Sequence, residues 1–150
     1  MRSWWQIPAM VLLLCCLGLA KTESLDELKT RADNAHGGDE AKLSIEYAHA
    51  ELEHANDLFT QGNVDQAQSA VSSVMTYVRK GTSAARSSGK RLKQTEIELR
   101  KLEKRMKDIA ESLNLDDRPP LLKSVDEIEQ LRAGLLAAMF GWQAEPKGKS

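Results

Sequence analysis

Cysteine is almost absent from this chain. Of its 150 residues only Cys15 and Cys16 are cysteines, and both precede the main part of the sequence. That distribution excludes disulfides, a cysteine nucleophile and cysteine-bound zinc from everything that follows. The motifs HExxH and GxSxG do not occur, and no serine has a recognisable base beside it. The sequence therefore predicts neither an enzyme nor a metal or other cofactor site.

The N-terminal segment is typical of an exported protein. It combines Arg2, an apolar run from about residue 7 to residue 19, and small residues at its end, which predicts a secretory signal cleaved after Ala20. The run is much shorter than the roughly 20 residues of a spanning helix, so an uncleaved membrane anchor is the weaker interpretation. Cys15 and Cys16 lack the small preceding residue of a lipobox, which argues against lipidation. We expect a periplasmic or extracellular protein.

The rest of the chain has strong helix signals and almost no strand signals. Ser24 and Glu27 form a capping box, Asp39 can cap a second helix, and Gly62-Asn63 supplies a tight turn between helices. Apolar residues recur at alternating steps of three and four, which places them on one face. The pattern predicts an all-α protein with helices at about 24–35, 39–61, 65–113 and 121–141.

The third of these helices is the longest. One heptad frame runs from Ala67 to Leu113 through the small residues Gly81, Ala85 and Ser88. Two helices joined by a flexible linker would have no reason to share a register, so we expect one helix of about 70 Å. The small residues permit close approach of a neighbouring backbone. A local bend between residues 81 and 89 stays open, because each glycine there costs about 1 kcal/mol of helix propensity.

The last helix is expected to follow the break at Pro119-Pro120, with Ser124 and Glu127 as its capping box. Arg132 is the polar exception on its apolar seam. The shorter helices should fold back along the long one as an elongated helical hairpin or bundle. The domains are then a signal peptide at 1–20, a single helical domain at 21–141 and a flexible tail at 142–150.

Charge is distributed unevenly, although the net charge is only −1. Residues 21–65 hold 11 acidic and 4 basic side chains, whereas residues 79–107 hold 11 basic and 3 acidic ones. Five cations in the second segment recur every seven residues and would form one line along a helix. This basic stripe, a candidate contact for anionic lipid or an envelope glycan, consists of Arg79, Arg86, Lys93, Arg100 and Lys107.

Internal ion pairing is the preferred explanation of the basic stripe. Glu96 and Glu103 lie at helical spacing from its lower members, and the Gly62-Asn63 turn would bring the acidic arm alongside its upper members. The expected partners on that arm are Glu46, Glu51, Glu53 and Asp57. Only Tyr77 lies near the stripe, so the aromatics that stack on bases are missing, which argues against nucleic acid.

Two further patterns have ordinary structural explanations. Glu46-x-x-His49 and Glu51-x-x-His54 resemble the pairs of ferritin-like di-iron bundles, but both lie on one helix about 140° apart, so they cannot close on one metal. The stretch LRAGLLAAMFGW at 131–142 is too short to span a bilayer. We interpret it as the buried face of the last helix, with docking to a membrane surface or a partner as the alternative.

Residues 47–71, YAHAELEHANDLFTQGNVDQAQSAV, resemble the middle of a tetratricopeptide repeat. Ala55, Gly62 and Ala67 match its small-residue positions around the turn. The likeness occurs once, and a solenoid needs several stacked copies, so it does not imply peptide binding. The signal peptide, helical hairpin and heptad helix together resemble the uncharacterised exported coiled-coil proteins of bacteria, a class that implies no activity.

We therefore expect a non-enzymatic, exported helical protein with a structural or protein–protein interaction role, acting with a protein partner or by self-association. The alternatives are an envelope-binding module that uses the basic stripe, and a periplasmic holdase chaperone with apolar inner surfaces.

Overall fold

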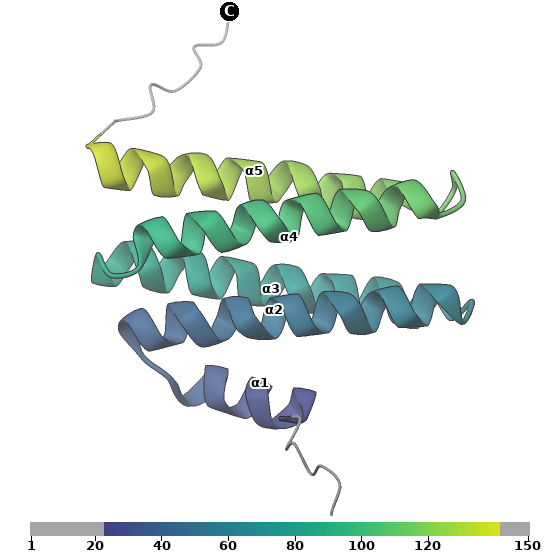
Figure 1. The fold of residues 1–150 in the computed structure, drawn as a ribbon, viewed down its shortest axis with the longest axis horizontal. Coiled ribbons are helices and arrows are strands. Elements are labelled where there is room, and N and C mark those ends of the chain that lie inside the picture. Colours follow the sequence, from purple (N-terminus) through teal and green to yellow (C-terminus); the bar gives the residue numbers. More distant parts are fainter. Residues whose placement is uncertain (1–22, 142–150) are drawn as a thin grey trace, which may run out of the picture.

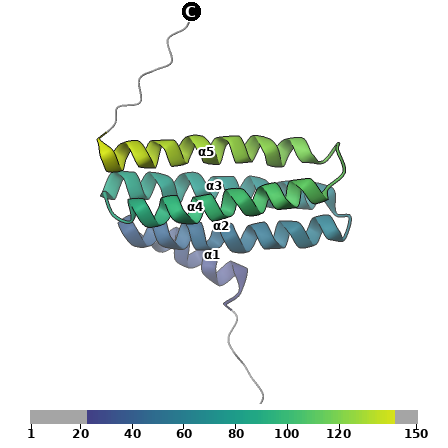
Figure 2. The same cartoon turned by 45° about the horizontal axis from the view of Figure 1, so that its top comes forward.

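The computed structural model describes residues 23–141, and within this range the chain is all-helical. The predicted fold class is confirmed. Helices α2 to α5 lie side by side, each antiparallel to the next along the chain, while the short α1 packs on α2 (Figures 1 and 2). The signal peptide and the tail predicted at the two ends lie outside the described residues. The helices are α1 (Leu25–Asn34), α2 (Gly37–Thr60), α3 (Val64–Ser88), α4 (Leu92–Ser112) and α5 (Arg118–Phe140).

The continuous helix expected at 65–113 is wrong. α3 ends at Ser88, and Gly89 and Arg91 adopt left-handed conformations with φ of 66° and 61° before α4 begins. Gly89 has no Cβ, so it takes this conformation at little cost and ends the helix. The chain then reverses, and α4 returns beside α3 (Figure 1). The shared heptad register does not require one rod, because each half buries its apolar face within the same bundle.

The predicted apolar faces form the core. α2 and α3 make the most extensive helix pair, and α4 packs mainly on α5. At Gly81 the two backbones approach so closely that an added Cβ would lie 3.1 Å from the carbonyl oxygen of Ala41, which confirms the expected role of small residues there. The largest fully buried apolar side chains are Leu52, Val74, Val78, Leu99, Leu102, Met106, Ile109, Leu121, Ile128 and Leu135.

Two predicted helix caps differ in the structure. The capping box of Ser24 and Glu27 is present and starts α1, as predicted. α2, however, begins at Gly37 after His36, with Asp39 inside its first turn rather than at its cap. The Ser124 hydroxyl lies within α5, where it donates a hydrogen bond of 3.0 Å to the Pro120 carbonyl. α5 begins earlier than expected because proline is tolerated in a first turn, where the N–H group has no partner within the helix.

A polar contact ties α1 to the hairpin of α2 and α3. The Tyr77 hydroxyl donates a hydrogen bond of 2.7 Å to the Asp33 carboxylate, and the Lys80 ammonium donates another of 2.9 Å. These bonds hold the pKa of Asp33 below its usual range.

Among residues 23–141, no helix carries an apolar stretch long enough to cross a membrane.

Candidate functional site

The helix break divides the basic stripe between two helices. Arg79 and Arg86 lie on α3, whereas Lys93, Arg100 and Lys107 lie on α4. The five cations therefore do not form one line along a rigid rod, because that geometry depended on the continuous helix. Their surroundings differ as well, since some have carboxylate partners and others have none among the described residues.

Internal pairing is confirmed for part of the stripe. Arg100 donates to Glu96 at 3.0 Å, and Lys107 donates to Glu103 at 2.6 Å, both at the predicted helical spacing. Arg79 makes a two-bond pair with Glu127 of α5, at 2.5 and 2.8 Å. We expected acids of α2 to pair with Arg79, and that expectation is wrong, because α5 and not α2 lies beside this flank of α3.

The acids of α2 have other surroundings. Glu53 pairs with Arg105 at 2.7 Å, and Glu46 lies 3.6 Å from Lys42. Glu51 is buried, and its Oε2 atom has no hydrogen-bond partner among the described residues. The predicted pairing of this arm with the upper stripe is therefore incorrect.

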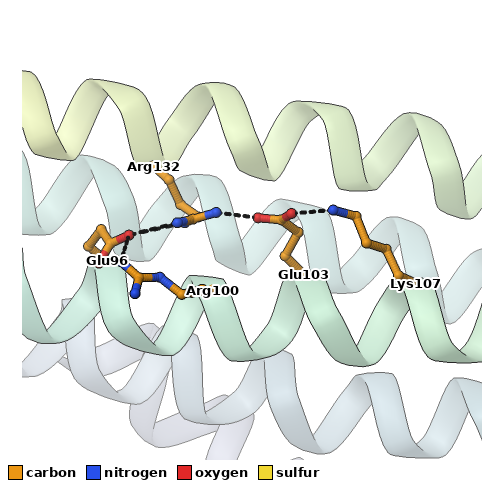
Figure 3. Close-up of polar contacts among 5 residues, drawn as sticks. All are labelled: Glu96, Arg100, Glu103, Lys107 and Arg132. Carbon is orange, nitrogen blue, oxygen red and sulfur yellow. Dashed lines mark hydrogen bonds and ion pairs between the residues drawn. The ribbon is translucent and has the colours of Figure 1, made fainter.

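Arg132 is the centre of a buried ionic cluster between α4 and α5 (Figure 3). Its guanidinium donates to Glu96 at 2.9 and 3.2 Å and to Glu103 at 2.5 Å. The side chain of Arg132 is 18% exposed, and those of Glu96 and Glu103 are 4% and 9% exposed. Arg132 occupies a position of the apolar seam of α5, so a polar residue there indicated a specific contact in the sequence. Its partners, Glu96 and Glu103, were not predicted.

The cluster keeps its carboxylates charged. Burial works to raise the pKa of Glu96 and Glu103, but hydrogen bonds from Arg100, Lys107 and Arg132 outweigh it and hold both pKa values below their usual range. A charged carboxylate that is saturated by cations is a poor proton donor and a poor general base near neutral pH. The arrangement is suited to setting the register of α5 on α4, which is the best-attested role of buried ionic groups.

His49 faces α4 beside a small cavity. Its Nε2 atom lies 3.6 Å from the Glu98 carboxylate, and the adjoining cavity of about 290 Å³ is lined in part by Ile45, Glu46 and Thr95. Burial lowers the pKa of His49, although Glu98 opposes the shift. Across residues 23–141 no group of three His, Cys, Asp or Glu side chains is arranged to hold a metal ion.

We expect His49 to make stability depend on pH. Its folded pKa lies below the unfolded value of about 6.5, so the unfolded chain takes up a proton first as the pH falls. The free energy of unfolding should therefore decrease from about pH 6.5 downward until the folded protein is protonated as well. Urea unfolding at several pH values measures this slope, and His49→Gln should flatten it. An unchanged slope in the variant would contradict the assignment.

A second cavity lies between α3 and α5. α5 packs much more lightly on α3 than on α4, which leaves an open groove of about 460 Å³. This α3–α5 groove is lined by Arg79, Thr82, Ser83, Arg86, Ser87, Leu131 and Ala138.

The second half of α5 is not the buried face that we expected. Leu135 is buried, but Leu131, Leu136 and Met139 are half-buried, and Phe140 is 74% exposed. This part of α5 is apolar on most of its sides, and its two neighbours, α4 and α3, cannot bury all of them. The sequence did contain a signal for this exposure. Residues 133–140 are all apolar or glycine, so whichever side of the helix faces solvent must expose apolar side chains.

The described part of the chain, residues 23–141, is thus a helical bundle with a buried ionic seam between α4 and α5 and an open groove between α3 and α5. No protein-family model matches the chain, and no curated protein or solved structure is significantly similar to it.

Proposed function

We propose that this chain is an exported, non-enzymatic helical protein that binds a helix of a partner protein in the α3–α5 groove. The observation that carries the proposal is the open groove itself, into which α5 presents the half-buried Leu131 and the exposed Ala138. Elsewhere the apolar faces of α2, α3 and α4 are buried in the bundle. Export is supported by the signal-peptide pattern of the first 20 residues.

The groove has the features of a helix-binding surface. A groove between two helices accepts the apolar face of a third helix, with anchoring side chains every three to four residues. Here Leu131 and Ala138 supply apolar lining, and Arg79 and Arg86 supply a charged rim. Arg86 has no carboxylate within ion-pair distance among the described residues. The rim therefore favours a partner helix with acidic residues beside its apolar face.

A non-enzymatic role is supported by the chemistry of the polar groups. The two carboxylates that share one buried cation, Glu96 and Glu103, are held by Arg132 and by Arg100 and Lys107. The one partly buried histidine, His49, lies beside a carboxylate and not beside a serine or threonine hydroxyl within hydrogen-bond distance. These groups serve the packing of the helices.

Site-specific crosslinking tests the groove. A photoreactive phenylalanine analogue at Ser83 should give a discrete crosslinked product in the producing cells, whereas the same analogue at the exposed Ser69 of α3 should not. Ala138→Trp, which fills the groove, should abolish the product while circular dichroism shows an intact helical fold. A product with twice the mass of the chain would identify the partner as a second copy. Equal products from both positions, or none, would contradict the proposal.

A further inference from the structure

We propose that one end of the bundle binds the surface of an anionic phospholipid membrane. This cationic end consists of the turn between α3 and α4 together with the C-terminal end of α5. Its residues are Arg86, Lys90, Arg91, Lys93 and Phe140. The proposal is independent of the α3–α5 groove, although the two surfaces share Arg86.

The four cations of this end are exposed and have no partner in the described structure. They fall within eight consecutive residues, and the break after α3 gathers them around one turn instead of spreading them along a rod. None of them takes part in an ion pair with a described residue. Two members of the basic stripe, Arg86 and Lys93, thus remain available here, while the other three are paired.

Few acidic groups oppose this charge. Asp39, in the first turn of α2, lies near Lys90 and Arg91, and Glu40 follows it. α5 contributes no acid here, because residues 130–141 contain none. Glu46 and Glu98 also line the cavity beside Arg91, but they pair with Lys42 and Lys101. The four unpaired cations therefore face two further acids, and this end of the bundle carries a net positive charge.

An exposed aromatic side chain lies at the same end. Because Arg132 pairs with Glu96 and the two helices are antiparallel, Phe140 lies about 12 Å further along α5, level with the turn between α3 and α4. Figures 1 and 2 show the end of α5 and this turn on the same side of the bundle. Phe140 is 74% exposed, and Met139 beside it is half-buried.

The other end of the bundle has the opposite charge. The first turn of α3, the end of α4 and the loop after α4 carry five acids and, within residues 108–118, one basic residue, Arg118. The acids are Asp65, Asp108, Glu111, Asp116 and Asp117. A molecule with ends of opposite sign orients its cationic end toward an anionic surface. The cations stand on long exposed side chains at one turn, and the exposed ring of Phe140 lies at the same end of the bundle. That arrangement fits a fluid headgroup layer, into which an aromatic ring can insert, better than a single folded ligand.

Vesicle co-sedimentation tests the proposal. The full protein, purified as the cell processes it, is mixed with vesicles of phosphatidylglycerol and phosphatidylcholine in equal parts, or of phosphatidylcholine alone. We expect binding only to the anionic vesicles, weakened by salt. Because each cation near such a surface contributes about a fivefold factor, the double variant R86E/K93E should bind at least about twentyfold more weakly. Phe140→Ser should also weaken binding, by several-fold.

The matched control is the double variant K104E/K123E, which changes the net charge equally at two exposed lysines away from the cationic end. It should bind like the wild type, and circular dichroism should show that all variants are folded. All variants share the same N-terminus, so their differences report this end alone. Equal losses in both double variants, or equal binding to both kinds of vesicle, would overturn the proposal.

Two other occupants are separate outcomes of the same experiment. If light scattering without vesicles shows salt-sensitive oligomers that R86E/K93E abolishes, and vesicles do not bind, the cationic end contacts the acidic end of a second copy. Binding of polyglutamate without binding of vesicles would indicate an acidic protein instead. Either result overturns the membrane proposal. Ala138→Trp should leave vesicle binding unchanged, which separates this test from that of the groove.

Discussion

Replacing Arg132 with methionine should lower the free energy of unfolding by about 3 kcal/mol. The change leaves Glu96 and Glu103 buried, with only their solvent-side partners Arg100 and Lys107. Removing one member of a buried ionic group costs about 3 to 5 kcal/mol because an uncompensated charge remains. Here Arg100 and Lys107 still compensate part of the charge of the two carboxylates, so we expect a loss of stability at the lower end of that range. Urea unfolding at neutral pH, followed by circular dichroism, measures the loss.

The triple variant E96L/E103L/R132M is the control for this prediction. It removes the buried charges together, so its stability should lie within about 1 kcal/mol of the wild type or exceed it. A comparable loss in the triple variant would mean that packing, and not charge, explains the effect of the single change. A loss below about 1 kcal/mol in Arg132→Met would show that the cluster does not hold α5.

The penalty in Arg132→Met should also shrink in acid. Glu96 and Glu103 have pKa values lowered by folding, so their contribution is complete above the unfolded pKa of about 4.3 and is lost as the pH falls through the lower folded pKa. Once both carboxylates are protonated, the buried sites hold no unpaired charge. Repeating the urea titrations at acid pH checks this, and a penalty that does not change with pH would contradict the assignment.

Replacing Gly81 with leucine should lower the free energy of unfolding by about 3 kcal/mol. An added Cβ alone would lie 2.9 Å from the Cδ1 atom of Ile45 and 3.1 Å from the backbone oxygen of Ala41. The Ile45 side chain can shift, but the backbone of α2 can yield only if the two helices separate. Overpacking of this kind costs about 1 to 3 kcal/mol, and the backbone contact favours the upper limit. Thermal or urea unfolding measures the change.

Gly134→Leu is the matched control, because both glycines lie inside helices without a left-handed backbone. An added Cβ at Gly134 meets only the mobile guanidinium of Arg86, at 3.7 Å. Helix propensity favours leucine over glycine by up to about 1 kcal/mol, so this variant should be at least as stable as the wild type. Similar losses at both positions would mean that the approach of α2 to α3 does not depend on Gly81.

Features that depend on neighbours along the chain could be predicted from the sequence. The capping box of Ser24 and Glu27 and the pairs of Arg100 with Glu96 and Lys107 with Glu103 all appear as expected. Each of these contacts joins residues three or four positions apart, so helix geometry alone brings them together. The apolar seams are buried for a similar reason, since a periodic face must be covered by some neighbour.

Only the tertiary structure decided which neighbour each face meets. The heptad register is compatible with one long helix and also with two helices folded on each other, and the turn at Gly89 and Arg91 produces the second arrangement. That reversal places α5 beside α3, so that Arg79 pairs with Glu127, 48 positions away in the sequence.

The same reversal created both proposed surfaces. It gathers at one end of the bundle four cations that have no ion-pair partner among residues 23–141, and it leaves the second half of α5 without a full cover on its α3 side. Periodicity along a helix says which residues share a face, but the choice between two ways of burying that face rests on contacts between residues far apart in the chain. Those contacts form only when the helices pack, which is why the helical character of these residues was predictable from the sequence, whereas the break between α3 and α4 and the arrangement of the helices were not.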